Sequence, residues 1–220
     1  MKISIQFLGT GTSQGVPFIG CECEVCQSLD PKDQRLRASV WVRSPRTSLI
    51  IDTGPDFRYQ MLRARVPRVD GVLFTHGHKD HVAGLDDIRA YNQIQKGPIH
   101  TYASAETQTV LHREFSYIFN QNPYPGIPRI EVHDLDHRRP LQIGDIPIQP
   151  IRVWHLGLEV LGFRMGDFTY ITDANRIEEE EMQKIRGSKV LVLNALRKEK
   201  HISHFNLDEA VSVAHSLEIP

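Results

Sequence analysis

The stretch Thr75-His76-Gly77-His78-Lys79-Asp80-His81 follows directly on the apolar run Val72-Leu73-Phe74. The run predicts a strand that delivers the chain to the edge of a sheet, and the polar residues after it predict a tight loop. The loop offers three imidazoles and one carboxylate, from His76, His78, Asp80 and His81. This donor set suits zinc, manganese or iron better than calcium or magnesium, which prefer mostly oxygen. With His76 and His78 turned toward one ion and Asp80 and His81 toward another, the stretch predicts a two-metal site.

The stretch resembles the His-x-His-x-Asp-His signature of the metallo-β-lactamase superfamily. The resemblance implies an α/β fold of the four-layer αββα type, with two mixed sheets face to face, helices outside and the metals along one sheet edge. It also implies metal-dependent hydrolysis and further ligands downstream. The alternative interpretation is a polar surface loop that happens to be rich in histidine.

Composition agrees with a chain of this kind. The 220 residues, of which 40% are hydrophobic, are enough for one domain with a substantial core, expected over 1–220. A formal net charge of -1 argues against a general binder of polyanions, so nucleic acid is not an expected partner. No apolar run approaches the length of a membrane span and no signal peptide is visible, so we expect a cytoplasmic protein without membrane contact. The oligomeric state stays open, a homodimer included.

Three cysteines, Cys21, Cys23 and Cys26, are the only ones in the chain and lie within six residues. An odd, clustered set cannot form a disulfide framework, so thiolate ligation of one structural zinc ion in the loop 21–26 is the better interpretation. A closed site needs a fourth ligand, from a distant histidine, an acidic residue or outside this chain. The alternative is three unrelated thiols on a loop.

The superfamily resemblance implies further ligands at strand ends. His155 follows the strand expected over 146–153, where the superfamily places a third imidazole for the first metal. Asp173 follows the strand expected over 168–172, and the matching aspartate in relatives bridges both metals. Asp52 matches a position that orients ligands without binding metal. Taken singly, His155 could equally be a structural histidine and Asp173 a simple turn residue.

The N-terminal stretch Phe7–Pro17, rich in glycine and followed by the cysteine cluster, resembles the phosphoribosyl cyclic phosphate phosphodiesterase branch of the superfamily. Its backbone amides and Ser13 could meet a substrate phosphate. The implied activity is hydrolysis of a small, cyclic phosphodiester by a metal-bridged hydroxide, using two zinc or manganese ions and Asp80 among the catalytic ligands. In this branch the histidine matching His204 protonates the leaving alcohol, a role that suits an imidazole. The competing view of His204 is a solvated side chain beside a helix cap.

The branch also has a final strand ending in Thr-His-x-Ser-His, which supplies one ligand to the second metal and one to the cysteine site. This sequence stops at Pro220, where that strand would begin. We therefore expect the C-terminal strand to be missing and both the second metal and the cysteine zinc to have reduced occupancy, in either a shortened product or a naturally short protein. The local mimic His201-Ile202-Ser203-His204 lacks the preceding threonine and strand.

Other functions on this fold remain open. These are a nuclease of the tRNA 3′-end-processing kind, a relative of cofactor-synthesis protein B of the pyrroloquinoline quinone pathway, and a non-catalytic or weakly active metal-binding protein. No basic arm for RNA is visible, which disfavours the nuclease. A thioesterase or lactamase would not need the N-terminal glycine and cysteine pattern, and His78 speaks against a redox di-iron protein.

The remaining expectations concern local structure. Strands are predicted over 39–43, 47–52 and 70–75, with helices after Pro55, from Ser104 to about 119, over 177–186 and from Asn206 to about 216. Asn175 is expected to cap the third of these helices, and a capping box of Asn206 and Glu209 to start the last. Two prolines within 146–153 predict an edge strand or a bulge. Five histidines show no ligand spacing and are expected to be surface or packing residues: His100, His112, His133, His137 and His215.

Overall fold

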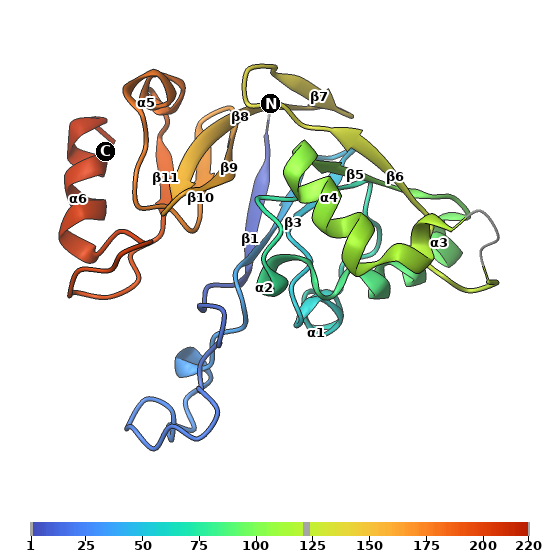
Figure 1. The fold of residues 1–220 in the computed structure, drawn as a ribbon, viewed down its shortest axis with the longest axis horizontal. Coiled ribbons are helices and arrows are strands. Elements are labelled where there is room, and N and C mark those ends of the chain that lie inside the picture. The colour runs from blue at the N-terminus through green and yellow to red at the C-terminus, as the bar shows by residue number, and fades with distance from the viewer. Residues whose placement is uncertain (1, 121–123, 220) are drawn as a thin grey trace. The chain divides into compact units, whose positions relative to one another are not determined.

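The computed structural model describes residues 2–120 and 124–219. It divides into two compact units, Met1–Asp134 and Leu135–Pro220, and each is described by itself. Each unit carries one mixed sheet flanked by helices (Figure 1), which confirms the predicted α/β class with two mixed sheets. The expectation of one domain over 1–220 stays a prediction.

The first unit is built on a six-stranded sheet in the order β1-β2-β3-β4-β5-β6. The pairs from β1 to β3 are antiparallel and those from β3 to β6 are parallel. The strands are β1 (Ser4–Gly9), β2 (Ser39–Arg43), β3 (Ser48–Ile51), β4 (Gly71–Leu73), β5 (Ile99–Ala103) and β6 (Ile130–Asp134). The expected strands over 39–43 and 47–52 are thus present, whereas β4 ends at Leu73, so that the following residues already belong to the turn into the histidine loop.

Four α-helices lie in the described part of this unit: α1 (Phe57–Ala64), α2 (Lys79–Val82), α3 (Arg89–Gln95) and α4 (Ala105–Glu114). Apolar residues from the strands and from α1, α3 and α4 form one core, which includes the fully buried Ile50, Val72 and Phe74. Helical spacing on the helices and period-two alternation on the strands explain why these side chains meet on one face of the sheet.

The helix α4 begins as predicted and ends earlier than predicted. The hydroxyl of Ser104 accepts a hydrogen bond from the backbone N–H of Thr107 at 3.3 Å. The helix stops at Glu114 because Phe115 leaves the helical conformation and buries its ring in the core; a short 3-10 turn, Ser116–Phe119, follows. The residues just beyond the predicted helix end at about 119 include 121–123, which lie outside the described residues.

The second unit contains a five-stranded sheet in the order β11-β10-β9-β8-β7. Its elements are β7 (Leu141–Ile143), β8 (Ile146–His155), β9 (Leu158–Met165), β10 (Phe168–Ile171), α5 (Glu179–Ile185), β11 (Val190–Leu193) and α6 (Leu207–Ser216). Ile151, Val153 and Ile171 of the strands form a core with Ile185 of α5 and Ala210 of α6. The strand β11, which pairs in parallel with β10, was not among the expected elements.

The two prolines of β8 flank the point at which this strand changes its partner. Ile146–Ile148 pair with β7, whereas Gln149–His155 pair with β9. Each proline therefore lies in a segment that pairs with one neighbouring strand, and a missing N–H can be tolerated there. The prolines thus mark the kind of edge that the sequence predicted, although β8 lies inside the sheet order.

No helix within the described ranges combines the length and apolar character needed to cross a membrane. This finding agrees with the absence of a long apolar run from the sequence.

The capping box at the start of α6 is present as predicted. Asn206 Oδ1 accepts from the backbone N–H of Glu209 at 2.8 Å, and Glu209 Oε2 accepts from the backbone N–H of Asn206 at 3.0 Å. The box satisfies two helix-terminal donors at once and fixes the chain direction immediately after His204.

We expect Asn206→Ala to lower the free energy of unfolding by about 1 kcal/mol, because it leaves a helix-terminal N–H without its acceptor. Asn206→Ser should retain most of the stability, since a serine hydroxyl can accept the same bond. Urea unfolding followed by circular dichroism measures both, with the half-exposed Val211→Ala in the same helix as the control. Equal stability of Asn206→Ala and the control would contradict the assigned role of the cap.

Candidate metal centre

The histidine loop begins where β4 ends and runs into the short helix α2. His78 precedes the first residue of α2 with extended backbone, and Asp80 and His81 lie within the helix. The ring centroids of His76 and His78 are 4.5 Å apart, and those of His76 and His81 are 4.2 Å apart. The loop therefore gathers its three imidazoles into one group, with His76 and His81 buried and His78 exposed.

Two glycines let the backbone come close enough to form this loop. A Cβ on Gly77 would lie 2.8 Å from Cγ2 of Val110 on α4, so its small size is needed for packing against a neighbouring helix rather than for an unusual backbone angle. A Cβ on Gly54 would lie 2.2 Å from the backbone oxygen of Asp80. The turn after β3 and the loop around Asp80 are thereby held in direct contact.

Asp52, the residue after β3, is the anchor of the loop. Its carboxylate is fully buried and accepts three hydrogen bonds. These come from the backbone N–H of Thr75 to Oδ1 at 2.8 Å, from the Thr75 hydroxyl to Oδ2 at 2.8 Å, and from His81 Nδ1 to Oδ2 at 2.7 Å. Burial raises the pKa of Asp52, whereas His81 and Thr75 oppose that rise.

The Asp52 network determines which imidazole nitrogens are available. An ionised carboxylate only accepts, so the proton of His81 lies on Nδ1 and Nε2 carries the lone pair. The Thr75 hydroxyl spends its one proton on Asp52, so it accepts from His76 Nδ1 at 3.0 Å. The lone pair of His76 therefore also lies on Nε2. A carboxylate that accepts the other ring proton orients a metal-binding histidine in this way.

Asp80 faces Nε2 of His81, the ring nitrogen that carries no proton when Nδ1 donates to Asp52. Its Oδ2 lies 3.3 Å from Nε2 of His81. A carboxylate oxygen and a bare imidazole nitrogen repel each other at this distance, so the pair requires a proton or a cation between them. The donor chemistry of the first unit therefore fits a divalent metal ion.

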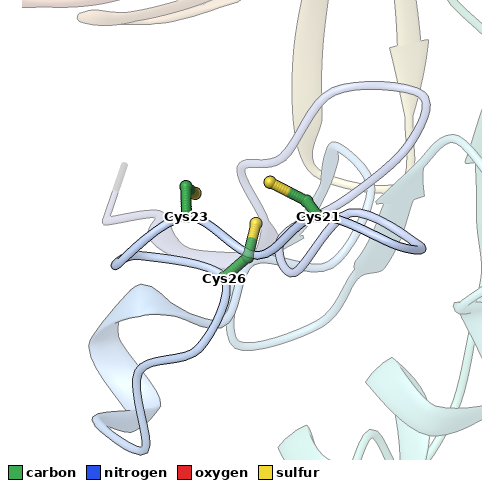
Figure 2. A group of neighbouring side chains, drawn as sticks. All are labelled: Cys21, Cys23 and Cys26. Atoms are coloured by element: carbon green, nitrogen blue, oxygen red, sulfur yellow. The ribbon is translucent and has the colours of Figure 1, made fainter.

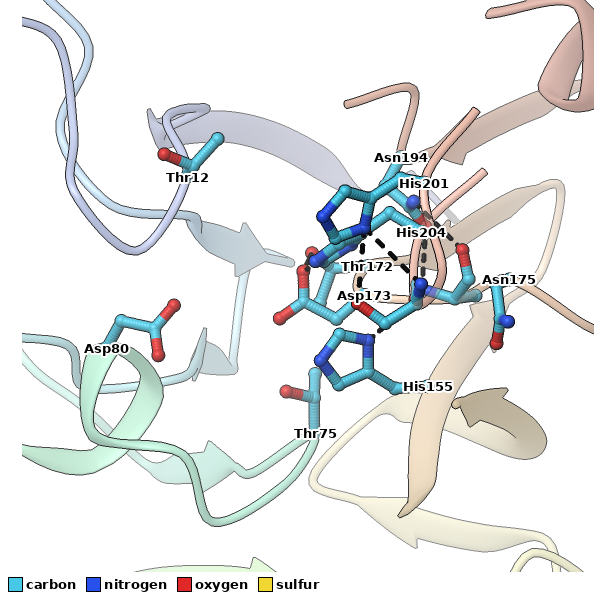
Figure 3. A network of polar contacts seen from close by, with 12 residues as sticks. Thr12, Thr75, Asp80, His155, Thr172, Asp173, Asn175, Asn194, His201 and His204 are labelled. Atoms are coloured by element: carbon cyan, nitrogen blue, oxygen red, sulfur yellow. Dashed lines mark hydrogen bonds and ion pairs between the residues drawn. The ribbon is translucent and has the colours of Figure 1, made fainter. Parts of the chain in front are cut away.

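In the second unit, His155, Asp173 and His204 lie together (Figure 3). His155 Nδ1 donates to the backbone oxygen of Ser203 at 2.7 Å, which leaves Nε2 as the donor atom for a metal. His204 Nδ1 lies 3.7 Å from Asp173 Oδ1, and the rings of His155 and His204 are 4.6 Å apart. The structure thus brings these three predicted residues into one group.

Two asparagines position this group, and one of them corrects a prediction. Asn175 does not cap α5, which starts after Glu178 without a side-chain cap. Its side chain instead accepts from the backbone N–H of Leu156 and donates to the backbone oxygen of Ile202, each at 2.9 Å. The side chain of Asn175 thus bonds the backbone of two separate turns instead of the helix, which begins four residues later at Glu179.

Asn194, after β11, makes paired hydrogen bonds with the backbone of Ala174, at 2.8 Å to its N–H and 3.0 Å to its carbonyl. The same carbonyl accepts from the backbone N–H of Phe205 at 2.7 Å. The turn after Asp173 and the segment that carries His204 are therefore tied to one another. Sequence reasoning missed Asn194 because it missed β11, and gave no role to Thr75 although it quoted that residue.

The glycine-rich N-terminal loop closes over the segment 35–37. Gly11 N–H donates to the Leu36 oxygen and Val16 N–H to the Arg35 oxygen, each at 2.8 Å. Arg37 then links the loop to the start of α1, since its Nε donates to the Ser13 carbonyl at 3.1 Å and its Nη1 to Asp56 Oδ1 at 3.1 Å. Ser13 itself is exposed, so its hydroxyl is placed in a fixed but open loop.

The three cysteines form a separate group (Figure 2). Their sulfur atoms all lie within 4.8 Å of one another, close enough to share one ion. A hydrogen bond from the backbone N–H of Cys26 is the main cause that lowers the pKa of Cys23. Thiolates are good zinc ligands, and within the described residues the group comprises these three donors.

Comparison with known proteins agrees with this geometry. Residues 47–220 match the model of the beta-lactamase superfamily domain. The chain is 35% identical over 215 residues to an octanoyltransferase of Porphyromonas gingivalis, covering 97% of this chain and 43% of that protein. It is 29% identical over 135 residues to a coenzyme PQQ synthesis protein B of Rhodopseudomonas palustris, covering 55% of this chain and 42% of that protein. The chain thus spans less than half the length of either of these curated relatives.

Among solved structures, a new diphosphatase from the PhnP family superposes with a TM-score of 0.92 at 40% sequence identity, covering 100% of this chain and 84% of that chain. The family match covers most of the chain, and this likeness covers its full length. The chain belongs to the metallo-β-lactamase superfamily.

Proposed function

We propose that the protein is a metal-dependent hydrolase that cleaves a P–O bond in a small phosphodiester or diphosphate. The observation that carries the proposal is the Asp52–Thr75 network, which commits His76 and His81 to present Nε2 as a ligand atom. A polar surface loop without a ligand does not need buried hydrogen bonds that fix the tautomers of two histidines. The 40% identity to a diphosphatase of the PhnP family supports a phosphorus-containing substrate.

The proposed ligands are those that the sequence predicted: His76, His78, Asp80, His81, His155 and Asp173. The resemblance to the superfamily signature is the reason for assigning these residues as ligands. Zinc or manganese bound there would act as a Lewis acid toward phosphoryl oxygens and lower the pKa of a bound water. Asp52 would keep the imidazoles in the ligand tautomer, and Asp80 would supply the negative charge that a dication needs.

His204 is proposed as the proton donor to the departing oxygen. Its ring lies beside His155 and its Nδ1 is 3.7 Å from Asp173, so it belongs to the metal-facing group of its unit. The capping box after it and the hydrogen bond from the Phe205 N–H to the Ala174 carbonyl restrict where the ring can go. Ser13, in the loop held by Arg37, is proposed to meet the substrate phosphate.

The other relatives support a different function less well. More than half of the octanoyltransferase lies outside the matched region, so its octanoyl-transfer activity need not belong to the part that resembles this chain. The PQQ synthesis protein B matches 55% of this chain.

The cysteine group is proposed to hold one structural zinc ion, separate from the hydrolytic metals.

The proposal predicts that a chelator abolishes hydrolysis of bis(p-nitrophenyl) phosphate and that added zinc or manganese restores it. A β-lactam and an acyl thioester, tested with the same metal-loaded protein, should be turned over far more slowly. A metal-loaded, folded protein that cleaves neither phosphodiesters nor diphosphates would sink the proposal and favour a non-catalytic role. Cleavage of precursor tRNA in preference to small esters would favour the nuclease.

We expect Asp52→Asn to reduce metal affinity or activity by roughly 10–100-fold, the usual effect of losing a partner of a ligating histidine. When the asparagine oxygen accepts from the Thr75 N–H, its NH₂ group faces His81 Nδ1 and favours the tautomer with a proton on Nε2. Metal titration by calorimetry measures the affinity. Asp70→Asn, which removes a carboxylate that binds the Ser48 N–H at 2.7 Å, is the matched control. Equal metal affinity in both variants would contradict the orienting role.

His204→Ala should slow hydrolysis of alkyl esters by about 10²–10⁴-fold and of p-nitrophenyl esters much less, because only a poor leaving group needs a proton. Metal content should stay unchanged. The control is His201→Ala, because the ring centroid of His201 lies 5.2 Å from that of His204. If loss of His204 instead lowers metal content and slows all esters alike, then His204 is a ligand rather than an acid.

A further inference from the structure

A third group of donor side chains lies in the first unit, on the outermost parallel pair of strands. His100 is on β5, and Glu131 and His133 are on β6. In the register of this pair His100 lies opposite Glu131, and Tyr102 lies opposite His133. Because side chains alternate along a strand, all four point to the same face of the sheet, away from the core side chains Ile99, Thr101 and Ala103.

The three potential ligand atoms converge. His100 Nδ1 lies 2.9 Å from His133 Nε2 and 3.2 Å from Glu131 Oε2, and all three donors lie within 4.8 Å of one another. Ligand atoms at two corners of a tetrahedral zinc site, with bonds of about 2.0–2.1 Å, are about 3.3 Å apart. The observed separations therefore need changes of only a few tenths of an ångström at the two contacts made by His100.

We propose that His100, Glu131 and His133 form an accessory site for a divalent transition metal, zinc above all. Two imidazoles and one carboxylate are a zinc donor set, and three protein ligands leave the remaining position to water or to a further ligand. The side chains of His100 and Glu131 are 47% and 52% exposed, so an ion can reach the site from solvent. Calcium and magnesium are excluded by the two nitrogen donors.

The scaffold holds the ligands in place. The backbone positions are fixed by parallel pairing of β5 with β6, which continues from Ile99–Ile130 to Ala103–Asp134. The ring of Tyr102 stacks on that of His133, with centroids 4.9 Å apart and an interplanar angle of 24°, so the imidazole plane is restrained as well. A site on paired strands is better preorganised than one on a loop.

Hydrogen bonding alone satisfies this group less well than a cation. His100 Nδ1 makes both short contacts, one to an imidazole nitrogen and one to a carboxylate oxygen. A single proton on this atom cannot point along both contacts at once. A metal ion among the three atoms removes this competition and neutralises the carboxylate. The site shares no residue with the histidine loop or the cysteine group, so it is independent of the proposed hydrolytic centre.

The test uses the full-length protein, stripped of metal, dialysed against zinc chloride and analysed for zinc per chain. The wild type should bind one equivalent more than the double variant His100→Ala/His133→Ala. Glu131→Gln, which keeps the shape of the side chain, should weaken that equivalent by about tenfold or more, since even partners outside the ligand shell cost that much. Phosphodiester hydrolysis should be the same in all these variants.

The matched control is His112→Ala/His215→Ala, which also removes two exposed histidines but touches no donor group among the described residues. It should bind as much zinc as the wild type. Circular dichroism melting shows whether each variant folds, and Glu131→Gln carries the test if the double variant does not. Identical zinc stoichiometry and affinity in wild type, Glu131→Gln and the two double variants would overturn the proposal.

Discussion

The buried carboxylate of Asp52 is the constraint on which the rest of the first unit's site depends. It stands directly after β3 and receives a backbone and a side-chain hydrogen bond from Thr75, in the turn after β4, together with the Nδ1 proton of His81. One side chain thus joins two parallel strand ends to the helix that follows them. The parallel pairing of β3 with β4 supplies the frame, because it brings the two strand ends to the same sheet edge.

The two units orient their imidazoles with acceptors of different charge. His81 donates to a carboxylate, whereas His155 donates to the neutral backbone oxygen of Ser203. A charged acceptor makes the opposite ring nitrogen more basic, so His81 should be the stronger ligand of the two. It also carries a cost, because a buried carboxylate must be compensated, and burial raises the pKa of Asp52 accordingly. A cation held by His81 and Asp80 would supply that compensation.

Features set by neighbouring residues could be predicted from the sequence, and features set by strand register could not. The histidine loop, the strands β2 and β3 and the capping box of Asn206 all follow from local pattern, and the structure has them. The prediction that Asn175 caps a helix was wrong, because its side chain bonds the backbone of two turns instead. His100 and His133 are 33 residues apart and meet only through the pairing of β5 with β6, so no spacing rule marks them as partners.

The backbone at the candidate site residues of each unit shows why these residues follow strand ends. Asp52 and Asp173 have left-handed backbone, with φ of 62° and 49°, and Leu156, directly after His155, has φ of 60°. For a residue with a side chain this conformation is unfavourable, by about 1 kcal/mol or more, and it persists only where surrounding structure enforces it. Glycine would relieve the strain at Asp52 and Asp173 but would remove the carboxylate that each position presents. The left-handed backbone at these strand ends therefore serves the same purpose as the hydrogen bonds of Asp52. Both hold a side chain in a fixed position at a sheet edge.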